Sequence, residues 1–152
     1  MVDRTIRGSS PMADRSEPGV PPPAEWLQEV EPPRRRDEGL LLLERLSTVT
    51  GLPPVMWSKR LIGFGRYAYT YESGRSGEWF MVGFSPGKRE IAIHVLPGYR
   101  DLGEPLTRLG PHRLGKSCLY LSDLSRNDLD ALDDIVRDGI DHLRANYPTF
   151  ER

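Results

Sequence analysis

One cysteine and three histidines are all that this 152-residue chain offers for thiol chemistry and for nitrogen or sulfur ligation of a metal. Cys118 has no second cysteine with which to form an intramolecular disulfide, so nothing suggests an oxidising compartment. No apolar run approaches the roughly 18 residues of a membrane-spanning helix, and the N-terminus lacks the apolar segment of a secretory signal. We therefore predict a cytoplasmic protein without a membrane partner.

An excess of positive charge is missing as well. The chain has 21 Lys and Arg against 22 Asp and Glu, which gives a formal net charge of −1. Proteins that bind nucleic acid normally carry a clear basic excess on one face. The composition therefore argues against a nucleic-acid partner, and we expect a small molecule or another protein instead.

The N-terminal segment has few side chains from which a core is built. Residues 1–23 are crowded with Pro, Gly, Ser, Asp and Arg, and such a stretch cannot offset the entropy lost on ordering. We predict a disordered extension over 1–23 and a single domain over 24–147. Translation starting at Met12 instead of Met1 is an open alternative.

Apolar residues recur at helical spacing in two long segments. The first runs from about 34 to 50, and Gly51 is placed to end it. The second starts near Ser125, a residue suited to cap a helix, and a short helix is expected from Pro23. The apolar stripe of the second long helix consists of Leu129, Leu132, Val136, Ile140 and Leu143.

Between these helices the apolar pattern changes to alternation, which is typical of strands. The segments with this pattern, separated by short glycine- or proline-containing turns, are 61–72, 79–85, 90–96 and 116–121. Connections this short join antiparallel strands. The predicted fold class is therefore α+β, an antiparallel β-sheet with the N- and C-terminal helices packed on one face.

Strict alternation divides the strand residues between the two faces of the sheet. If Ile62 and Phe64 face the helices, Gly63 and Gly65 leave a gap on the other face, where a ligand has room. The side chains expected around that gap are Tyr67, Tyr69, Lys116, Cys118 and Tyr120, with Tyr71 alongside. Tyrosine offers a flat apolar ring with a hydroxyl, and lysine binds anions. The simpler interpretation is that tyrosines populate exposed strand faces through propensity alone.

Cys118 is also a candidate nucleophile. Thiol catalysis needs a nearby base, and the only histidines are His94, His112 and His142. The sequence does not place any of them beside the cysteine. A lone cysteine in a strand is more often a small packing residue, so we predict no catalytic residue.

Two charged segments have simple structural interpretations. Asp130, Asp134, Asp138 and Asp141 line one side of the last helix; such carboxylates collect hard cations weakly, but a solvated helix face is the preferred interpretation. The run 34–36 of three arginines is expected to be the solvated first turn of the first long helix. We therefore predict no metal site and no cofactor.

Several segments together resemble the family called domain of unknown function 1801, or YdhG-like proteins. They occur in the family's order between about Ala24 and Leu143. They are Pro54-Val55-Met56-Trp57, Ile62-Gly63-Phe64-Gly65, Tyr67-Ala68-Tyr69, Ser73-Gly74-Arg75, Val82-Gly83-Phe84-Ser85-Pro86, Leu109-Gly110-Pro111-His112 and Gly115-Lys116-Ser117-Cys118-Leu119-Tyr120. Gly87-Lys88 departs from the pattern, because the family commonly has a basic residue directly after the proline. The resemblance implies an α+β fold with an antiparallel sheet. It also points to a frataxin-like branch described as an intracellular iron chaperone.

Three functional hypotheses follow, in order of preference. The first is a non-enzymatic binding module that uses the tyrosine-rich sheet face for a small molecule or a protein. The second is a frataxin-like iron chaperone, and the third is an enzyme built on Cys118.

Overall fold

The computed structural model describes residues 21–70, 72–95, 103–115 and 118–151. The helices are α1 (Pro23–Leu27), α2 (Pro33–Thr50), α3 (Glu104–Leu109) and α4 (Leu129–Asn146), with a short 3₁₀ helix η1 (Leu124–Arg126) before α4. The strands are β2 (Pro54–Ser58), β3 (Leu61–Phe64), β4 (Arg66–Thr70), β5 (Ser76–Trp79), β6 (Val82–Pro86), β7 (Ile91–His94), β8 (Arg113–Leu114), β9 (Cys118–Leu121) and β10 (Thr149–Phe150).

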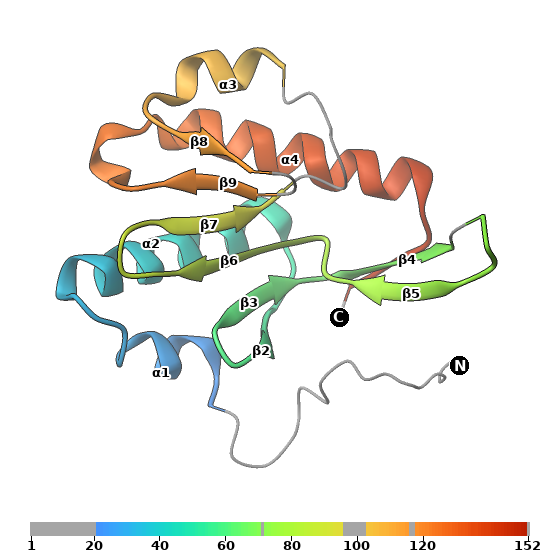
Figure 1. Ribbon diagram of the computed structural model, residues 1–152, viewed down its shortest axis with the longest axis horizontal. Coiled ribbons are helices and arrows are strands. Elements are labelled where there is room, and N and C mark those ends of the chain that lie inside the picture. The colour runs from blue at the N-terminus through green and yellow to red at the C-terminus, as the bar shows by residue number, and fades with distance from the viewer. Residues whose placement is uncertain (1–20, 71, 96–102, 116–117, 152) are drawn as a thin grey trace.

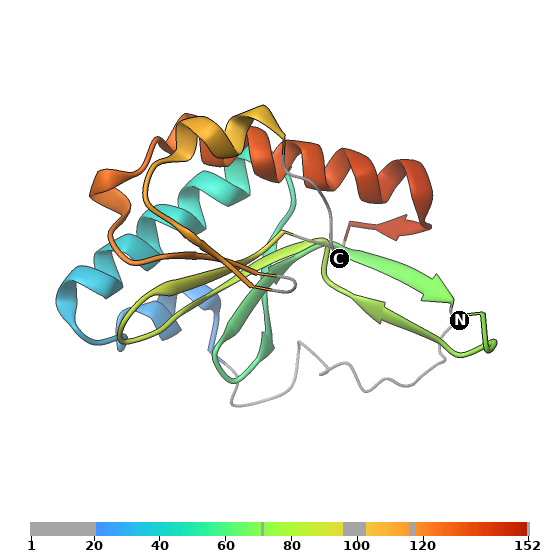
Figure 2. The same ribbon diagram turned by 45° about the horizontal axis from the view of Figure 1, so that its top comes forward.

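These strands form two sheets with antiparallel pairing throughout. The larger has the order β2-β3-β6-β7-β9-β8, and the smaller has the order β10-β4-β5. Figures 1 and 2 show α2 and α4 side by side on one face of the six-stranded sheet, with α3 packed on α4 and α1 on α2. The predicted α+β class, with an antiparallel sheet and its main helices on one face, is confirmed.

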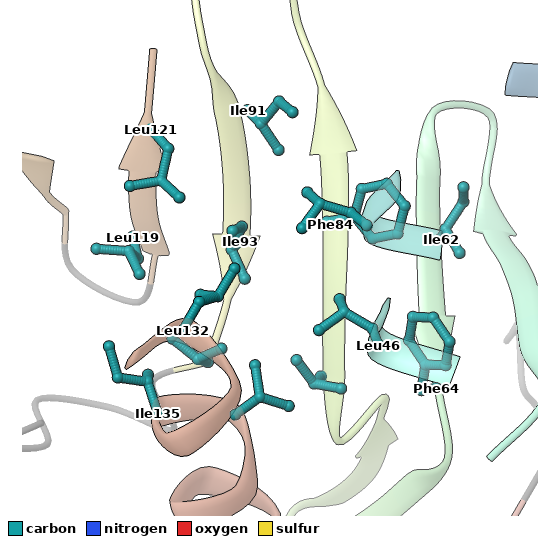
Figure 3. Close-up of a cluster of buried hydrophobic side chains, with 14 of the residues drawn as sticks. Leu46, Ile62, Phe64, Phe84, Ile91, Ile93, Leu119, Leu121, Leu132 and Ile135 are labelled. Atoms are coloured by element: carbon teal, nitrogen blue, oxygen red, sulfur yellow. The ribbon is translucent and has the colours of Figure 1, made fainter. Parts of the chain in front are cut away.

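The core lies between the six-stranded sheet and these helices. Cross-strand register aligns Ile62, Phe84, Ile93 and Leu119 in one row, and all four side chains are fully buried. Leu132 of α4 packs in the same cluster (Figure 3). The predicted inward face of the strands and the apolar stripe of the last helix are therefore both confirmed.

The predicted strand 61–72 is in fact two strands, and this corrects the predicted faces. Gly65 separates β3 from β4 with φ +67°, a left-handed conformation that favours glycine. The chain turns at Gly65 and β4 enters the smaller sheet, so the alternation of β3 does not continue into β4. Tyr67 consequently packs against the core and lies 5.1 Å, between ring centroids, from Tyr147 at the end of α4.

The start of the last helix also differs from prediction. α4 begins at Leu129, where the Asp128 carboxylate accepts hydrogen bonds from the backbone N–H groups of Asp130 and Ala131. Ser125 lies earlier, within η1, so Asp128 is the cap. An aspartate cap carries a full negative charge at the positive end of the helix dipole, which favours it over serine at this position.

The arginine run at the start of α2 is not a uniformly solvated turn. Arg35 is 1 % exposed and donates hydrogen bonds to the carbonyls of Gly87 and Ser122 and to the Glu38 carboxylate. These partners come from two strand ends and the helix itself. Burial of its charge is tolerated because each of the three guanidinium nitrogens donates to an acceptor.

The ends of the predicted domain are only partly described. Residues 1–20 lie outside the described part of the chain, so the predicted disordered extension stays a prediction. At the other end, β10 pairs with β4 beyond the predicted boundary at 147.

Candidate functional site

The six-stranded sheet has a second face, which points away from α2 and α4 and which we call the outward face. Register places Gly63, Gly83, His94 and Cys118 in one row across β3, β6, β7 and β9 on this face. The next row places Tyr120 beside Arg113 of β8. The structure thus brings together one histidine, the cysteine and one of the predicted tyrosines.

The predicted gap beside Gly63 is filled by aromatic rings, which corrects the sequence interpretation. A Cβ added at Gly63 would lie 2.6 Å from Trp57 Cδ1 and 2.8 Å from Phe80 Cβ. The Trp57 and Phe80 rings meet edge to face with centroids 5.5 Å apart, and both residues are buried. The absence of a side chain at Gly63 therefore lets these rings lie directly on the sheet. No space for a ligand is left between the rings and the sheet.

His94, Cys118 and Tyr120, which we call the His94 cluster, lie beside this aromatic layer. Cys118 Sγ is 3.4 Å from His94 Nδ1 and 3.7 Å from Nε2, and the His94 ring stands edge to face with Phe80 at 5.4 Å. A hydrogen bond with Cys118 is the largest cause that raises the pKa of Tyr120. Tyr120 lies two residues from Cys118 on the same face of β9, so the phenol, the thiol and the imidazole are neighbours beside the aromatic layer.

The geometry of the cluster is better suited to binding than to proton transfer. The sulfur is almost equally far from both ring nitrogens, so it is not in line with the lone pair of either one. A base that activates a thiol holds it through one directed hydrogen bond. Cys118 is also buried, whereas a reactive thiol needs partial exposure.

Burial lowers the pKa of His94, so its imidazole is neutral at physiological pH. A neutral imidazole can donate one hydrogen bond and accept another. The unfolded chain takes up a proton at this histidine more readily than the folded protein does. The contribution of His94 to the free energy of unfolding is therefore fully present above about pH 6.5 and is lost as the pH falls below that value.

Tyr120 is fixed by its neighbours at the β8 edge of the sheet. Its ring covers Gly115, where an added Cβ would lie 2.7 Å from Tyr120 Cε2. The Arg113 guanidinium carbon is 4.1 Å from the ring centroid, and the same guanidinium pairs with Glu90. Tyr120 thus has a defined orientation, with its hydroxyl on the outward face.

The other predicted site residues do not join this cluster. Tyr67 and Tyr69 lie in β4, in the smaller sheet, with ring centroids 6.0 Å apart. They share a face with each other, as predicted, but not with Cys118 and Tyr120. Lys116 and Tyr71 lie outside the described residues. The predicted single tyrosine-rich face is therefore wrong.

The sequence listed His94 as one of three histidines but did not place it beside Cys118. Trp57 and Phe80 were missed altogether. The available signal was Gly63 and Gly83, two glycines in neighbouring strands, because paired glycines in a sheet mark a close approach by large side chains.

A hollow lies on another part of the molecule, between the start of α2 and the chain that leads into α4. Its volume is about 340 Å³, and it is lined by Arg34, Asp37, Glu38, Leu41, Asp123, Leu124, Ser125 and Leu129. Several of these charges already have partners: Arg34 pairs with Asp123, and Glu38 pairs with Arg35. We therefore rank this hollow below the His94 cluster as a binding site.

The acidic side of α4 is held by arginines. Arg45 of α2 contacts Asp133 at 2.9 Å and Asp130 at 2.7 Å. Asp134 contacts Arg108 of α3 at 2.8 Å and Arg137 at 3.1 Å. Across the described ranges, no group of three or more His, Cys, Asp or Glu side chains is placed to hold a metal ion.

We expect only weak ferrous iron binding at this helix, because a metal ion must displace these arginines to reach the carboxylates. Anaerobic titration of the protein with ferrous iron, followed by calorimetry, measures this directly. A tight stoichiometric site that disappears in the Asp134→Asn, Asp138→Asn double variant would contradict the expectation. Asp37→Asn, on α2, is the matched control.

Comparisons of the chain with protein-family models, with curated proteins and with solved structures found no match. The resemblance to the YdhG-like family therefore stays a prediction. None of the helices within the described residues is long and apolar enough to span a membrane.

Proposed function

We propose that this chain is a non-enzymatic binding module that holds a small molecule or a protein partner on the outward face, at the His94 cluster. The observation that carries the proposal is the pairing of His94 with Cys118 across β7 and β9, with Tyr120 two residues along the same face of β9, next to an aromatic layer. Binding sites commonly combine apolar surface with a few placed polar groups.

The chemistry of the cluster defines the kind of ligand. Neutral His94 and the Tyr120 hydroxyl supply both donors and acceptors, whereas the Arg113 guanidinium at the edge is already paired with Glu90. Trp79, at the end of β5, is 38 % exposed and its ring is 4.4 Å from that of Phe80. A ligand with a flat apolar part and a neutral polar group matches these side chains.

A thermal-shift screen against such compounds tests the proposal, because a ligand that binds the native state raises the melting temperature by mass action. For the best compound, Tyr120→Phe is expected to weaken binding about fivefold, since it removes one hydrogen bond worth about 1 kcal/mol. His94→Gln replaces the imidazole ring with an amide and should weaken binding of the compound further.

Matched controls separate this site from the rest of the molecule. Tyr69→Phe makes the same change in the smaller sheet, and His112→Gln makes the same change at an exposed histidine. Both should leave the affinity unchanged. Two results would contradict this site. One is an equal loss of affinity in Tyr120→Phe and Tyr69→Phe, and the other is an unchanged affinity in both His94→Gln and Tyr120→Phe.

A further inference from the structure

The smaller sheet projects from the body of the molecule as an arm built on β4 and β5. Figures 1 and 2 show these two strands extending beyond the six-stranded sheet, past the end of α4. One side of β4 is occupied by β10, and the other by β5. Within the described residues, no strand pairs with the outer side of β5.

Hydrogen bonding of β4 determines which groups β5 presents outward. The Ala68 N–H donates to the Pro148 carbonyl at 3.0 Å, so the backbone groups of Ala68 point away from β5. Glu78 is the residue opposite Ala68, and in an antiparallel ladder such a pair exchanges no hydrogen bonds. The N–H and C=O of Glu78 therefore point away from β4. Those of Ser76, two residues earlier, point the same way.

We propose that the outer edge of β5 pairs with the same edge of a second copy of this chain. The outward groups of Ser76 and Glu78 are self-complementary about a two-fold axis at Gly77. In that register Ser76 of each copy exchanges both backbone hydrogen bonds with Glu78 of the other. The two arms then form one continuous sheet, and the interface is isologous.

The side chains around the axis are compatible with this register. Gly77 meets Gly77 of the second copy in a pair that makes no hydrogen bonds, where backbones approach to about 4.5 Å. The Tyr69 hydroxyl lies over Gly77, so Tyr69 of each copy covers this contact. The register also brings Arg75 of each copy towards the exposed ring of Trp79 in the other, a favourable cation–π arrangement.

The interface is small, which sets the expected strength of the dimer. Four edge residues per copy bury less than the roughly 1,000 Å² typical of stable interfaces. We expect a dissociation constant on the order of 10⁻⁴ M. The interface contains none of the three residues of the His94 cluster, although Trp79 borders both surfaces, so failure of the dimer would leave the proposed function intact.

Sedimentation of the full chain from about 10 µM to about 1 mM tests the dimer. We expect the mean mass to rise with concentration. Glu78→Pro removes the outward N–H but no hydrogen bond between β4 and β5, and edge positions tolerate proline. It should weaken the dimer by at least about tenfold. Glu78→Ala is the control: it removes the same carboxylate, which pairs with Arg66, but keeps the N–H and should keep the dimer.

A cross-linking variant tests the register independently of whether Glu78→Pro folds. Gly77→Cys places two thiols at the two-fold axis, and its Cβ meets only the far end of the Tyr69 side chain. Oxidation should link Gly77→Cys into dimers, whereas Ser73→Cys, at the exposed turn, should stay largely monomeric. A monomer at every concentration, a dimer that Glu78→Pro leaves intact, or equal cross-linking at both positions would overturn the proposal.

Discussion

Replacing Arg35 with alanine is expected to lower the free energy of unfolding by about 3–5 kcal/mol. Arg35 is almost fully buried and donates to the Gly87 carbonyl at 2.9 Å, to the Ser122 carbonyl at 3.2 Å and to Glu38. Glu38 also accepts a hydrogen bond from the Leu124 N–H at 3.0 Å. Removing the guanidinium leaves a buried carboxylate without its cation and two carbonyls without a donor.

Arg36→Ala is the matched control for this loss. Arg36 is the next residue of the same helix and pairs with Glu31, whose side chain is 69 % exposed. Its removal should cost no more than about 1 kcal/mol. The double variant Arg35→Met, Glu38→Leu removes both charges together and should recover part of the stability. Urea denaturation measures all three variants, and equal losses for Arg35→Ala and Arg36→Ala would contradict the buried network.

The second large effect is expected in α4. Leu132→Ala should cost about 2–5 kcal/mol, because Leu132 is fully buried between α4 and the sheet and the substitution leaves a cavity. Val136→Ala, one turn later and also buried, removes fewer methyl groups and should cost about 1–3 kcal/mol.

Asp134→Ala is the control on the opposite side of the same helix. Its side chain is 43 % exposed and contacts Arg108 and Arg137, so the change should cost no more than about 1 kcal/mol. Denaturant midpoints of the three variants give the comparison. Similar midpoints for all three would show that the apolar side of α4 is not the side that packs on the sheet.

Local patterns were sufficient to predict the long helices. The spacing of Leu132, Val136 and Ile140 is a property of neighbouring residues, and it determines which side of α4 is buried whatever the helix packs against. The alternation in β3 was equally local, and Ile62 and Phe64 are buried as predicted.

Interactions between distant segments could not be predicted in this way. Arg35 reaches acceptors 52 and 87 residues away, and nothing in a run of three arginines indicates which one will be buried. His94 and Cys118 meet because β7 and β9 pair in one particular register. A shift of one residue would have placed them on opposite faces.

The error at Gly65 has a specific physical cause. Tyr67 and Tyr69 do share a face, but the left-handed glycine before them takes β4 into a different sheet, where Tyr67 packs against the core. A single glycine within an alternating segment is compatible with either a continuous strand or a break, because glycine adopts both conformations at little cost. Sequence alternation alone therefore does not determine the face of any residue that follows it.

Amide chemical-shift mapping with the best compound from the screen tests the central claim most directly. If the ligand lies on the outward face at the His94 cluster, the largest shifts should come from β7 and β9, around His94 and Tyr120. The amides of α4 near Arg137 should hardly move. Largest shifts at the hollow around Glu38 and Leu124, or along β4 near Tyr69, would contradict the account.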